Sequence, residues 1–245
     1  VDENEDPVER ALHLSREKKP AGLLFLGGDR RMYAKSFGEI TLPSVVLTTD
    51  AARLGFDNLS SVTTDDVEAA ECAMEYLLES GHRRIGVIAG DLSCSGPSRL
   101  RYEGCLLALE RCGLTLPDEC CATARYAFQD GYDAALRLLE QPGLTAIFAM
   151  SDVMAIGAMR ALHDRGLRIP EDISVIGFDG LELGEFYTPK LTTIRQQASL
   201  LVDRGVALLL GTLERGAVAR HETVPFTLAV RESTSHPPRK DGTNS

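Results

Sequence analysis

Three polar residues follow two apolar runs of this sequence and could bind a small polar molecule. Ser151 and Asp152 come directly after the run 147–150, and Asp179 comes directly after the run 174–178. Short apolar runs of this kind are typical of parallel strands that are covered on both faces. Ligands of open parallel sheets bind just beyond the carboxyl ends of the strands. The sequence therefore predicts a binding site that is made of side chains and not of a glycine-rich phosphate loop.

Arg101 and Asp179 form a donor and an acceptor that suit a polyhydroxylated ligand. Arg101 lies in the first turn of a predicted helix, 98–112, and we expect it to face the end of the predicted strand 84–89. Its guanidinium offers five donors in a rigid fork, which suits vicinal hydroxyls, a carboxylate or a carbonyl. The Asp179 carboxylate could accept two hydrogen bonds from sugar or nucleoside hydroxyls. The alternatives are a surface arginine and an aspartate that caps the turn at Leu181.

Strands and helices alternate regularly along the chain and would position these residues. The predicted strands span 22–26, 44–48, 84–89, 122–126, 147–150, 174–178 and 222–230. The predicted helices span 8–18, 32–37, 64–80, 98–112, 130–139, the segment between Val153 and Gly166, and 198–213. Asp6 and Pro7 are typical of a helix start, and Gly166 is typical of a helix end. Regular alternation predicts parallel sheets with right-handed crossovers, that is, a doubly wound α/β architecture.

The composition is that of a globular protein and argues against several classes of protein. The chain has 245 residues, of which 44% are hydrophobic and 25% are charged, and its net charge is −10. No basic run is longer than a few residues, so we expect no DNA-binding surface within this chain. No apolar run approaches the roughly 20 residues that cross a bilayer, and the acidic first residues are unlike a signal peptide. We therefore expect a cytoplasmic protein with no membrane contact.

The cysteines and histidines of the chain predict neither a metal site nor an active site. None of the six cysteines forms a CxxC pair, and no histidine stands at zinc-ligand spacing from them. Without an export signal we expect reduced thiols, with Cys105 and Cys112 on the core face of one helix. Cys94 could be a nucleophile, but no histidine is placed to activate it, and His82 is expected in an exposed turn. We expect no cofactor and no catalysis, since GxSxG and P-loop motifs are also missing.

Several segments, taken in their order and spacing, resemble the effector-binding region of LacI/GalR-type transcriptional regulators, which share the periplasmic sugar-binding-protein fold. They are SGHRRIGVIAG (80–90), RLRYEGCLLAL (99–109), FQDGYDAALRLL (128–139), SDVMAIGAMRALHDRGLRIPEDISVIGFDG (151–180), TPKLTTIRQ (188–196) and VRESTS (230–235). The likeness covers nearly the whole chain from Pro7 to Ser235. It implies two α/β lobes joined by three crossovers, with the ligand in the cleft between them and a helix-turn-helix domain ahead of the first lobe.

The resemblance also implies how the chain is divided. The N-terminal lobe would comprise 1–90 and 195–219, and the C-terminal lobe would comprise 91–194 and 220–235, followed by a flexible tail, 236–245. The crossovers would fall near residues 90–91, 193–194 and 219–220. Compared with the family, this sequence lacks the DNA-binding domain, the hinge helix, and the first strand and helix of the N-terminal lobe.

The family pattern implies ligand contacts at three positions of this chain. Arg101 and Asp179 match residues that contact the effector. Tyr126 matches an aromatic position that packs against the effector ring, because a flat apolar face suits a sugar or a base. Core packing is the alternative for Tyr126, and we expect Phe128 in the core.

Other positions depart from the family pattern or are less specific. Ser151 stands where asparagine is common, and Thr48 stands where aspartate is common. Shorter side chains make fewer hydrogen bonds and leave room for a larger substituent or a water, so the usual hexose contacts are in question. Gln196, beside a crossover, is either a ligand contact or a hinge residue. Ser95 is expected to line the cleft, whereas Asp152 is expected only to supply a favourable charge to its helix.

These features predict the effector-sensing domain of a LacI-type regulator. A small sugar-like or nucleoside-like effector would favour one arrangement of the lobes and so control operator DNA binding by an N-terminal helix-turn-helix domain. In the family the regulator is a homodimer, and we expect apolar helix faces such as that of 65–78 to form the interface. The alternative is the solute-binding protein of a sugar transport system, which would be exported and would rarely carry six unpaired cysteines.

Overall fold

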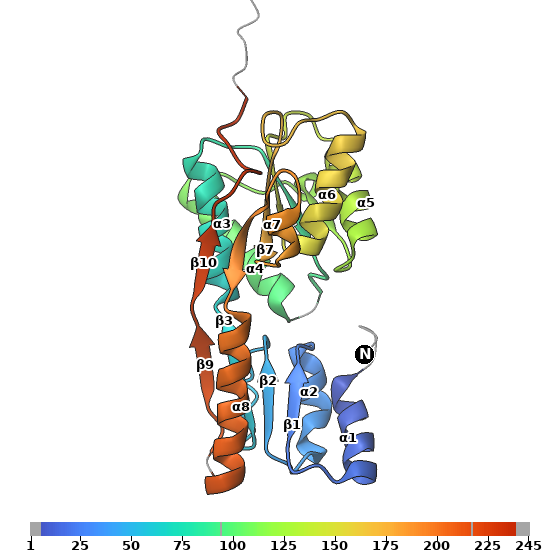
Figure 1. Cartoon of the computed structure of the whole chain (residues 1–245), viewed down its shortest axis with the longest axis vertical. Helices are drawn as coiled ribbons and strands as arrows, with labels where there is room; N and C mark the ends of the chain where they lie inside the picture. The colour runs from blue at the N-terminus through green and yellow to red at the C-terminus, as the bar shows by residue number, and fades with distance from the viewer. Residues whose placement is uncertain (1–5, 94, 217, 239–245) are drawn as a thin grey trace, which may run out of the picture. The chain divides into compact units, whose positions relative to one another are not determined.

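The computed structural model describes residues 6–93, 95–216 and 218–238. The chain folds into two compact α/β units, and Figure 1 labels most of their helices and several of their strands. Unit 1 comprises Val1–Asp65, Ser93–Pro97 and Gln197–Pro225, and unit 2 comprises Asp66–Leu92, Ser98–Gln196 and Phe226–Ser245. Each unit is therefore assembled from separate stretches of the chain.

Unit 1 is built on a parallel sheet with the strand order β1-β2-β3-β9. Its strands are β1 (Leu23–Leu26), β2 (Ser44–Leu47), β3 (Leu59–Thr64) and β9 (His221–Val224). One face is covered by α1 (Pro7–Lys18), α2 (Arg30–Ser36) and the short helix η1 (Phe37–Glu39), and the other by α8 (Ala198–Arg215). Side chains alternate along β2, so that Val46 packs with Phe25, whereas Val45 and Leu47 pack with Leu201 of α8.

Unit 2 is built on a sheet with the order β10-β8-β7-β6-β4-β5, which is parallel except for β10. Its strands are β4 (Ile85–Ala89), β5 (Cys121–Thr123), β6 (Ala146–Ala149), β7 (Ser174–Asp179), β8 (Thr192–Gln196) and β10 (Phe226–Ala229). Its helices are α3 (Asp66–Glu79), α4 (Pro97–Arg111), η2 (Asp118–Cys120), α5 (Phe128–Leu138), α6 (Asp152–Asp164) and α7 (Leu183–Phe186). Every residue of β4 and β6 is buried, as expected for strands covered on both faces.

The predicted helix ends are confirmed where the sequence carries a clear signal. The Asp6 side chain accepts hydrogen bonds from the backbone N–H groups of Val8 and Glu9, and Pro7 is the first helical residue. Gly166, with φ of 71°, follows the end of α6. Local capping chemistry therefore defines where these helices begin and end.

Two glycines allow α5 and α6 to pack backbone to backbone. A Cβ atom at Gly157 would lie 2.1 Å from the carbonyl oxygen of Phe128, and one at Gly131 would lie 2.4 Å from that of Met154. Real Cβ atoms do not approach other atoms so closely, so only glycine fits at either position. This contact fixes the distance between the two helices on one side of unit 2.

The unit boundaries lie at other positions than the family pattern led us to expect. β4 hydrogen-bonds to β5 and β6, and α3 packs in the same core, so residues 66–90 belong to unit 2. The later boundaries follow Gln196 and Pro225 instead of residues 193 and 219. The first residue of the expected tail contacts unit 2, since His236 Nδ1 donates to the Ser80 carbonyl at 2.8 Å. Residues 239–245 lie outside the described part of the chain.

The prediction of a single strand at 222–230 is wrong, because two strands of different sheets lie there. β9 pairs with β3 in unit 1, and β10 pairs with β8 in unit 2. Pro225 stands between them and has no N–H for a strand ladder. β3 and β8 escape prediction because their sequences, LSSVTT and TTIRQ, lack the apolar run that identifies a buried strand.

Candidate ligand-binding site

Arg101 is a buried cation at the start of α4, with only 5% of its surface exposed. Its Nε donates to Asp66 Oδ1 at 2.8 Å, and its Nη1 donates to the Met150 carbonyl oxygen at 2.6 Å. The guanidinium carbon lies 3.6 Å from the centre of the Phe178 ring. Burial acts to lower the pKa of Arg101, but the Asp66 and Asp179 carboxylates outweigh it and raise the pKa. Arg101 is therefore a fixed and permanently charged donor.

The Asp179 carboxylate lies beside this guanidinium, at the end of β7. Its Oδ1 is 3.9 Å from Arg101 Nη1 and accepts a hydrogen bond of 2.8 Å from Gln196 Nε2. Burial raises the pKa of Asp179, and Arg101 and Gln196 only partly oppose this effect. The side chain is 28% exposed, so the carboxylate can still receive hydrogen bonds from a bound molecule.

Tyr126 presents an aromatic ring near the same group of residues. Its hydroxyl is hydrogen-bonded to the hydroxyl of Ser98, which is buried in the first turn of α4. A Cβ atom at Gly90 would lie 2.9 Å from the ring carbon Cε2, so the glycine makes room for the tyrosine. Tyr126 is 38% exposed, which shows that the alternative of ordinary core packing is wrong.

These side chains gather where five parallel strands end. Gly90 follows β4, Tyr126 comes after β5, Met150 follows β6, Asp179 ends β7 and Gln196 ends β8. The predicted position of the polar groups, at the carboxyl edge of a parallel sheet, is thus observed in unit 2. The group offers a charged donor, a carboxylate acceptor, an amide and an aromatic face.

Ser151 and Asp152 lie at the same sheet edge but have structural partners. Ser151 is buried, and its Oγ accepts a hydrogen bond of 3.1 Å from the backbone N–H of Met154, which makes it the N-cap of α6. Asp152 is fully buried and accepts hydrogen bonds from Thr193 and Leu181. The expectation that Asp152 is only a first-turn charge is wrong, because the carboxylate points into the unit and not to solvent.

Thr48 and Ser95 belong to unit 1. Thr48 follows β2 and has a φ of 65°, which is unusual for a β-branched residue. The Ser95 hydroxyl donates to Asp29 Oδ1 at 3.1 Å. Their contribution to ligand binding stays a prediction. Cys94 lies outside the described residues.

Comparison with known proteins agrees with the observed fold. Residues 74–234 match the family model of the periplasmic binding protein-like domain. The repressor PurR of Pasteurella multocida (strain Pm70) is 38% identical over 67% of this chain and 51% of its own length. The ribose operon repressor of Escherichia coli (strain K12) is 36% identical over 84% of this chain and 62% of its own length. The crystal structure of a LacI family transcriptional regulator from Mycobacterium smegmatis superposes with a TM-score of 0.84 at 27% identity, covering 96% of this chain and 86% of the other.

The chain belongs to the LacI family. It spans between half and two thirds of the length of the curated relatives described above. These relatives are transcriptional repressors, which favours the regulator interpretation over the solute-binding protein of a transport system. Within this LacI-family chain, the matched region includes Arg101, Tyr126, Ser151, Asp179 and Gln196.

Local sequence patterns do not identify several residues of the site. Asp66 pairs with Arg101 across 35 positions of the chain, and Phe178 stacks under the same guanidinium. No spacing rule links residues so far apart. Ser98 stands three residues before Arg101 in the same helix, and this spacing, which places both side chains on one helix face, is the signal that could have identified it.

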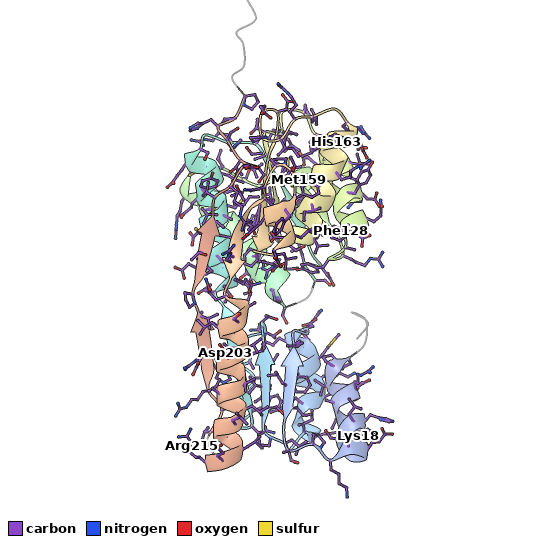
Figure 2. All side chains as sticks on the ribbon, in the orientation of Figure 1. Lys18, Phe128, Met159, His163, Asp203 and Arg215 are labelled. Atoms are coloured by element: carbon purple, nitrogen blue, oxygen red, sulfur yellow. The ribbon has the colours of Figure 1, made fainter. Side chains whose placement is uncertain are left out.

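Three further expectations about burial are wrong. His82 is fully buried, whereas Phe128, which Figure 2 labels at the start of α5, is 48% exposed. Cys105 is buried as expected, but Cys112 is exposed because α4 ends before it. Burial of single residues at helix ends and turns depends on distant segments that cover them.

The helix face expected to form a dimer interface is occupied within unit 2. The apolar residues of α3 belong to the unit's own core and are fully buried or nearly so: Ala69, Ala70, Ala73, Met74, Leu77 and Leu78. This face is not available to a second copy of the chain. The expectation for 65–78 is therefore wrong, while dimerisation itself stays a prediction.

The described residues contain neither a metal-binding cluster nor a helix suited to span a membrane. Residues 6–93, 95–216 and 218–238 hold no group of three or more His, Cys, Asp or Glu side chains arranged to bind a metal ion. Within the same ranges, no helix combines the length and the apolar character that a membrane span requires.

Proposed function

We propose that this LacI-family domain binds a small polar effector, sugar-like or nucleoside-like, and thereby controls operator binding by an N-terminal helix-turn-helix domain of the whole regulator. The observation that carries the proposal is the Arg101–Asp179 pair, in which a buried guanidinium and a partly exposed carboxylate lie 3.9 Å apart at the carboxyl edge of a parallel sheet. A pair of this kind can donate to and accept from neighbouring hydroxyls of one ligand.

Each side chain of the group has a proposed role. Arg101 donates to a ligand oxygen, and Asp179 accepts from hydroxyl groups. Tyr126 packs its ring against the flat face of a sugar or base, and Gln196 steadies Asp179 and can reach the ligand. Thr48, Ser95 and Ser151 are proposed as further lining residues. Since Ser151 already caps α6, we expect it to add less than a longer amide would.

A pentose is the first effector to test. The relative from Escherichia coli is named for the ribose operon, and a pentose carries the vicinal hydroxyls that a guanidinium and a carboxylate recognise. Effector binding would bias the regulator between two arrangements through unequal affinity for them. By linkage, operator DNA and effector then change each other's affinity by the same factor. We propose a homodimer that acts on DNA in the cytoplasm and binds its effector without catalysing a reaction.

The test is a thermal-shift screen with D-ribose, other sugars, sugar phosphates, polyols and nucleosides, followed by calorimetry on the compounds that stabilise the chain. Asp179→Asn removes a charged acceptor, so we expect affinity to fall by about 10-fold to 100-fold. Asp203→Asn makes the same change on the exposed surface of α8 and should leave affinity unaltered. A ligand that binds wild type and Asp179→Asn equally well would contradict the proposed site.

A further inference from the structure

Asp152 is a fully buried carboxylate that joins three elements of unit 2. It is the first residue of α6. Its Oδ1 accepts a hydrogen bond of 2.6 Å from the Thr193 hydroxyl on β8, and its Oδ2 accepts one of 2.6 Å from the backbone N–H of Leu181, in the turn after β7. A carboxylate with such short bonds on both oxygens orients its partners strongly.

The strand beneath Asp152 leaves space for this carboxylate. A Cβ atom at Gly177 of β7 would lie 2.3 Å from Asp152 Oδ1. A side chain at that position would displace the aspartate from the turn. Glycine at residue 177 is therefore part of the same arrangement.

The turn that Asp152 holds has an unfavourable backbone. Asp179 has a φ of 118°, a conformation that residues other than glycine rarely adopt, and Gly180 follows with a φ of 77°. Such backbone persists only where its surroundings fix it. Asp179 gains its position beside Arg101 and Gln196 in this conformation, and Leu181 is only two residues away.

We propose that Asp152 is a positioning residue of the ligand site: by holding the Leu181 N–H and, through Thr193, the strand β8, it fixes the turn 179–181 and so aims the Asp179 carboxylate. Asp152 does not touch the ligand. The inference rests on the proposed function insofar as Asp179 is the acceptor for the effector. It predicts that disturbing Asp152 misdirects Asp179 even when unit 2 stays folded.

The protonation state of Asp152 then affects the turn. Burial raises its pKa to about 7, although the hydrogen bonds from Thr193 and Leu181 oppose this effect. The charged group that faces it is Asp179 of β7, with Arg101 of α4 beyond, whereas β8 contributes the uncharged Thr193. The bond from the Leu181 N–H favours ionised Asp152, whereas burial disfavours it. Opening of the turn breaks this bond while Asp152 stays buried in α6, so the turn should be held more firmly above neutral pH than below it.

The first experiment measures the turn without any ligand. Amide hydrogen exchange of Leu181 and the side-chain amide signal of Gln196 are followed by NMR at pH 6 and pH 8, in wild type and Asp152→Asn. We expect the Leu181 protection factor to fall by about tenfold in the variant and to lose its dependence on pH between these values. The Gln196 amide should move toward the shift of a free side chain, because its acceptor has turned away.

The matched control is Asp172→Asn. Asp172 also accepts a backbone N–H, that of Arg168 at 2.8 Å, but it lies on the exposed surface beyond α6. It should leave Leu181 and Gln196 unchanged. If Asp152→Asn does not fold, Thr193→Val removes one bond to Asp152 while keeping the bond to Leu181, and a several-fold loss of Leu181 protection is expected.

The second experiment is calorimetry with D-ribose at the same two pH values. We expect Asp152→Asn to weaken binding by about tenfold. The part of the pH dependence of wild-type affinity that Asp152 contributes between pH 6 and pH 8 should be absent from the variant. Unchanged Leu181 and Gln196 signals in the variant overturn the inference, and so does an altered turn with unaltered D-ribose affinity. If D-ribose does not bind wild type, the pentose part of the proposed function fails, and the NMR signals alone decide on Asp152.

Discussion

The buried ring of His82 connects the segment at Ser235 to the core of unit 2. Its Nδ1 lies 2.8 Å from the Thr145 hydroxyl, and its Nε2 lies 2.9 Å from the carbonyl oxygen of Ser235. Burial lowers the pKa of His82, because the charged ring is disfavoured there, although the bond to Ser235 acts in the opposite direction. The neutral ring, with Nε2 protonated, satisfies both partners.

This histidine predicts a loss of stability in mild acid. Because the folded-state pKa lies below the unfolded value of 6.5, the unfolded chain binds the proton first as the pH falls below 6.5, and the free energy of unfolding decreases. Well above that value neither state binds the proton, so His82 contributes no pH dependence there. Urea unfolding followed by circular dichroism at pH 7.5 and pH 5.5 measures the effect.

The variant His82→Gln can bond both partners without titrating, so it should lose this acid sensitivity. The control is His163→Gln, because His163, which Figure 2 labels, lies on the exposed surface of α6. Asp152 acts with the opposite sign, since its raised pKa makes stability decline as the pH rises from about 4 to about 7. The comparison is therefore between wild type and variant at each pH. Equal acid sensitivity in wild type and His82→Gln would refute the prediction.

At the scale of elements, the contact between α5 and α6 depends on glycine. A methyl group at residue 157 would meet the backbone of α5, which cannot move aside as a flexible side chain can. Gly157→Ala should therefore lower the free energy of unfolding by about 3 kcal/mol, measured by urea titration.

Gly211→Ala is the matched control, in the half-buried C-terminal part of α8. Among the described residues, the end of the Arg215 side chain, at 3.4 Å, is the one atom within 4 Å of its Cβ position outside the helix backbone. Alanine is the better helix former, so this change should stabilise the protein by about 0.5–1 kcal/mol. If both substitutions changed the free energy of unfolding in the same way, Gly157 would not be required for the packing of α5 against α6.

At the scale of the whole molecule, unit 1 exposes a stripe of apolar side chains. Val202, Val206, Leu210 and Leu213 of α8 recur at helical spacing and are 39–51% exposed. Leu26 of β1, on the sheet edge, is 79% exposed. Apolar side chains exposed along one face of a helix often mark an interaction site.

We expect this stripe to support self-association of the chain at micromolar concentration. The double variant Leu26→Ser/Leu210→Ser should weaken the association by about tenfold or more, as measured by analytical ultracentrifugation, because two apolar contacts are lost. Phe186→Ser, which changes an apolar residue of unit 2 that is 77% exposed, is the comparison. A larger effect of Phe186→Ser would place the interface in unit 2 and contradict the prediction.

The sequence by itself determined the features that depend on short segments. The alternation of strands and helices, the caps at Asp6 and Gly166, and the polar residues at strand ends are all visible in patterns of a few residues. The order and spacing of the motifs were sufficient to identify the family. These features are predictable because helix capping, side-chain periodicity and burial on both faces act locally along the chain.

Only the tertiary structure decided which residues meet. The ion pair between Asp66 and Arg101, the bonds of Asp152 to Leu181 and Thr193, and the separation of β9 from β10 into two sheets join segments that no local pattern connects. Asp152 and His82 are buried and hydrogen-bonded within unit 2, whereas their sequence context suggested exposed groups. The physical reason is that the environment of a polar group is set by the distant elements that cover it and supply its partners.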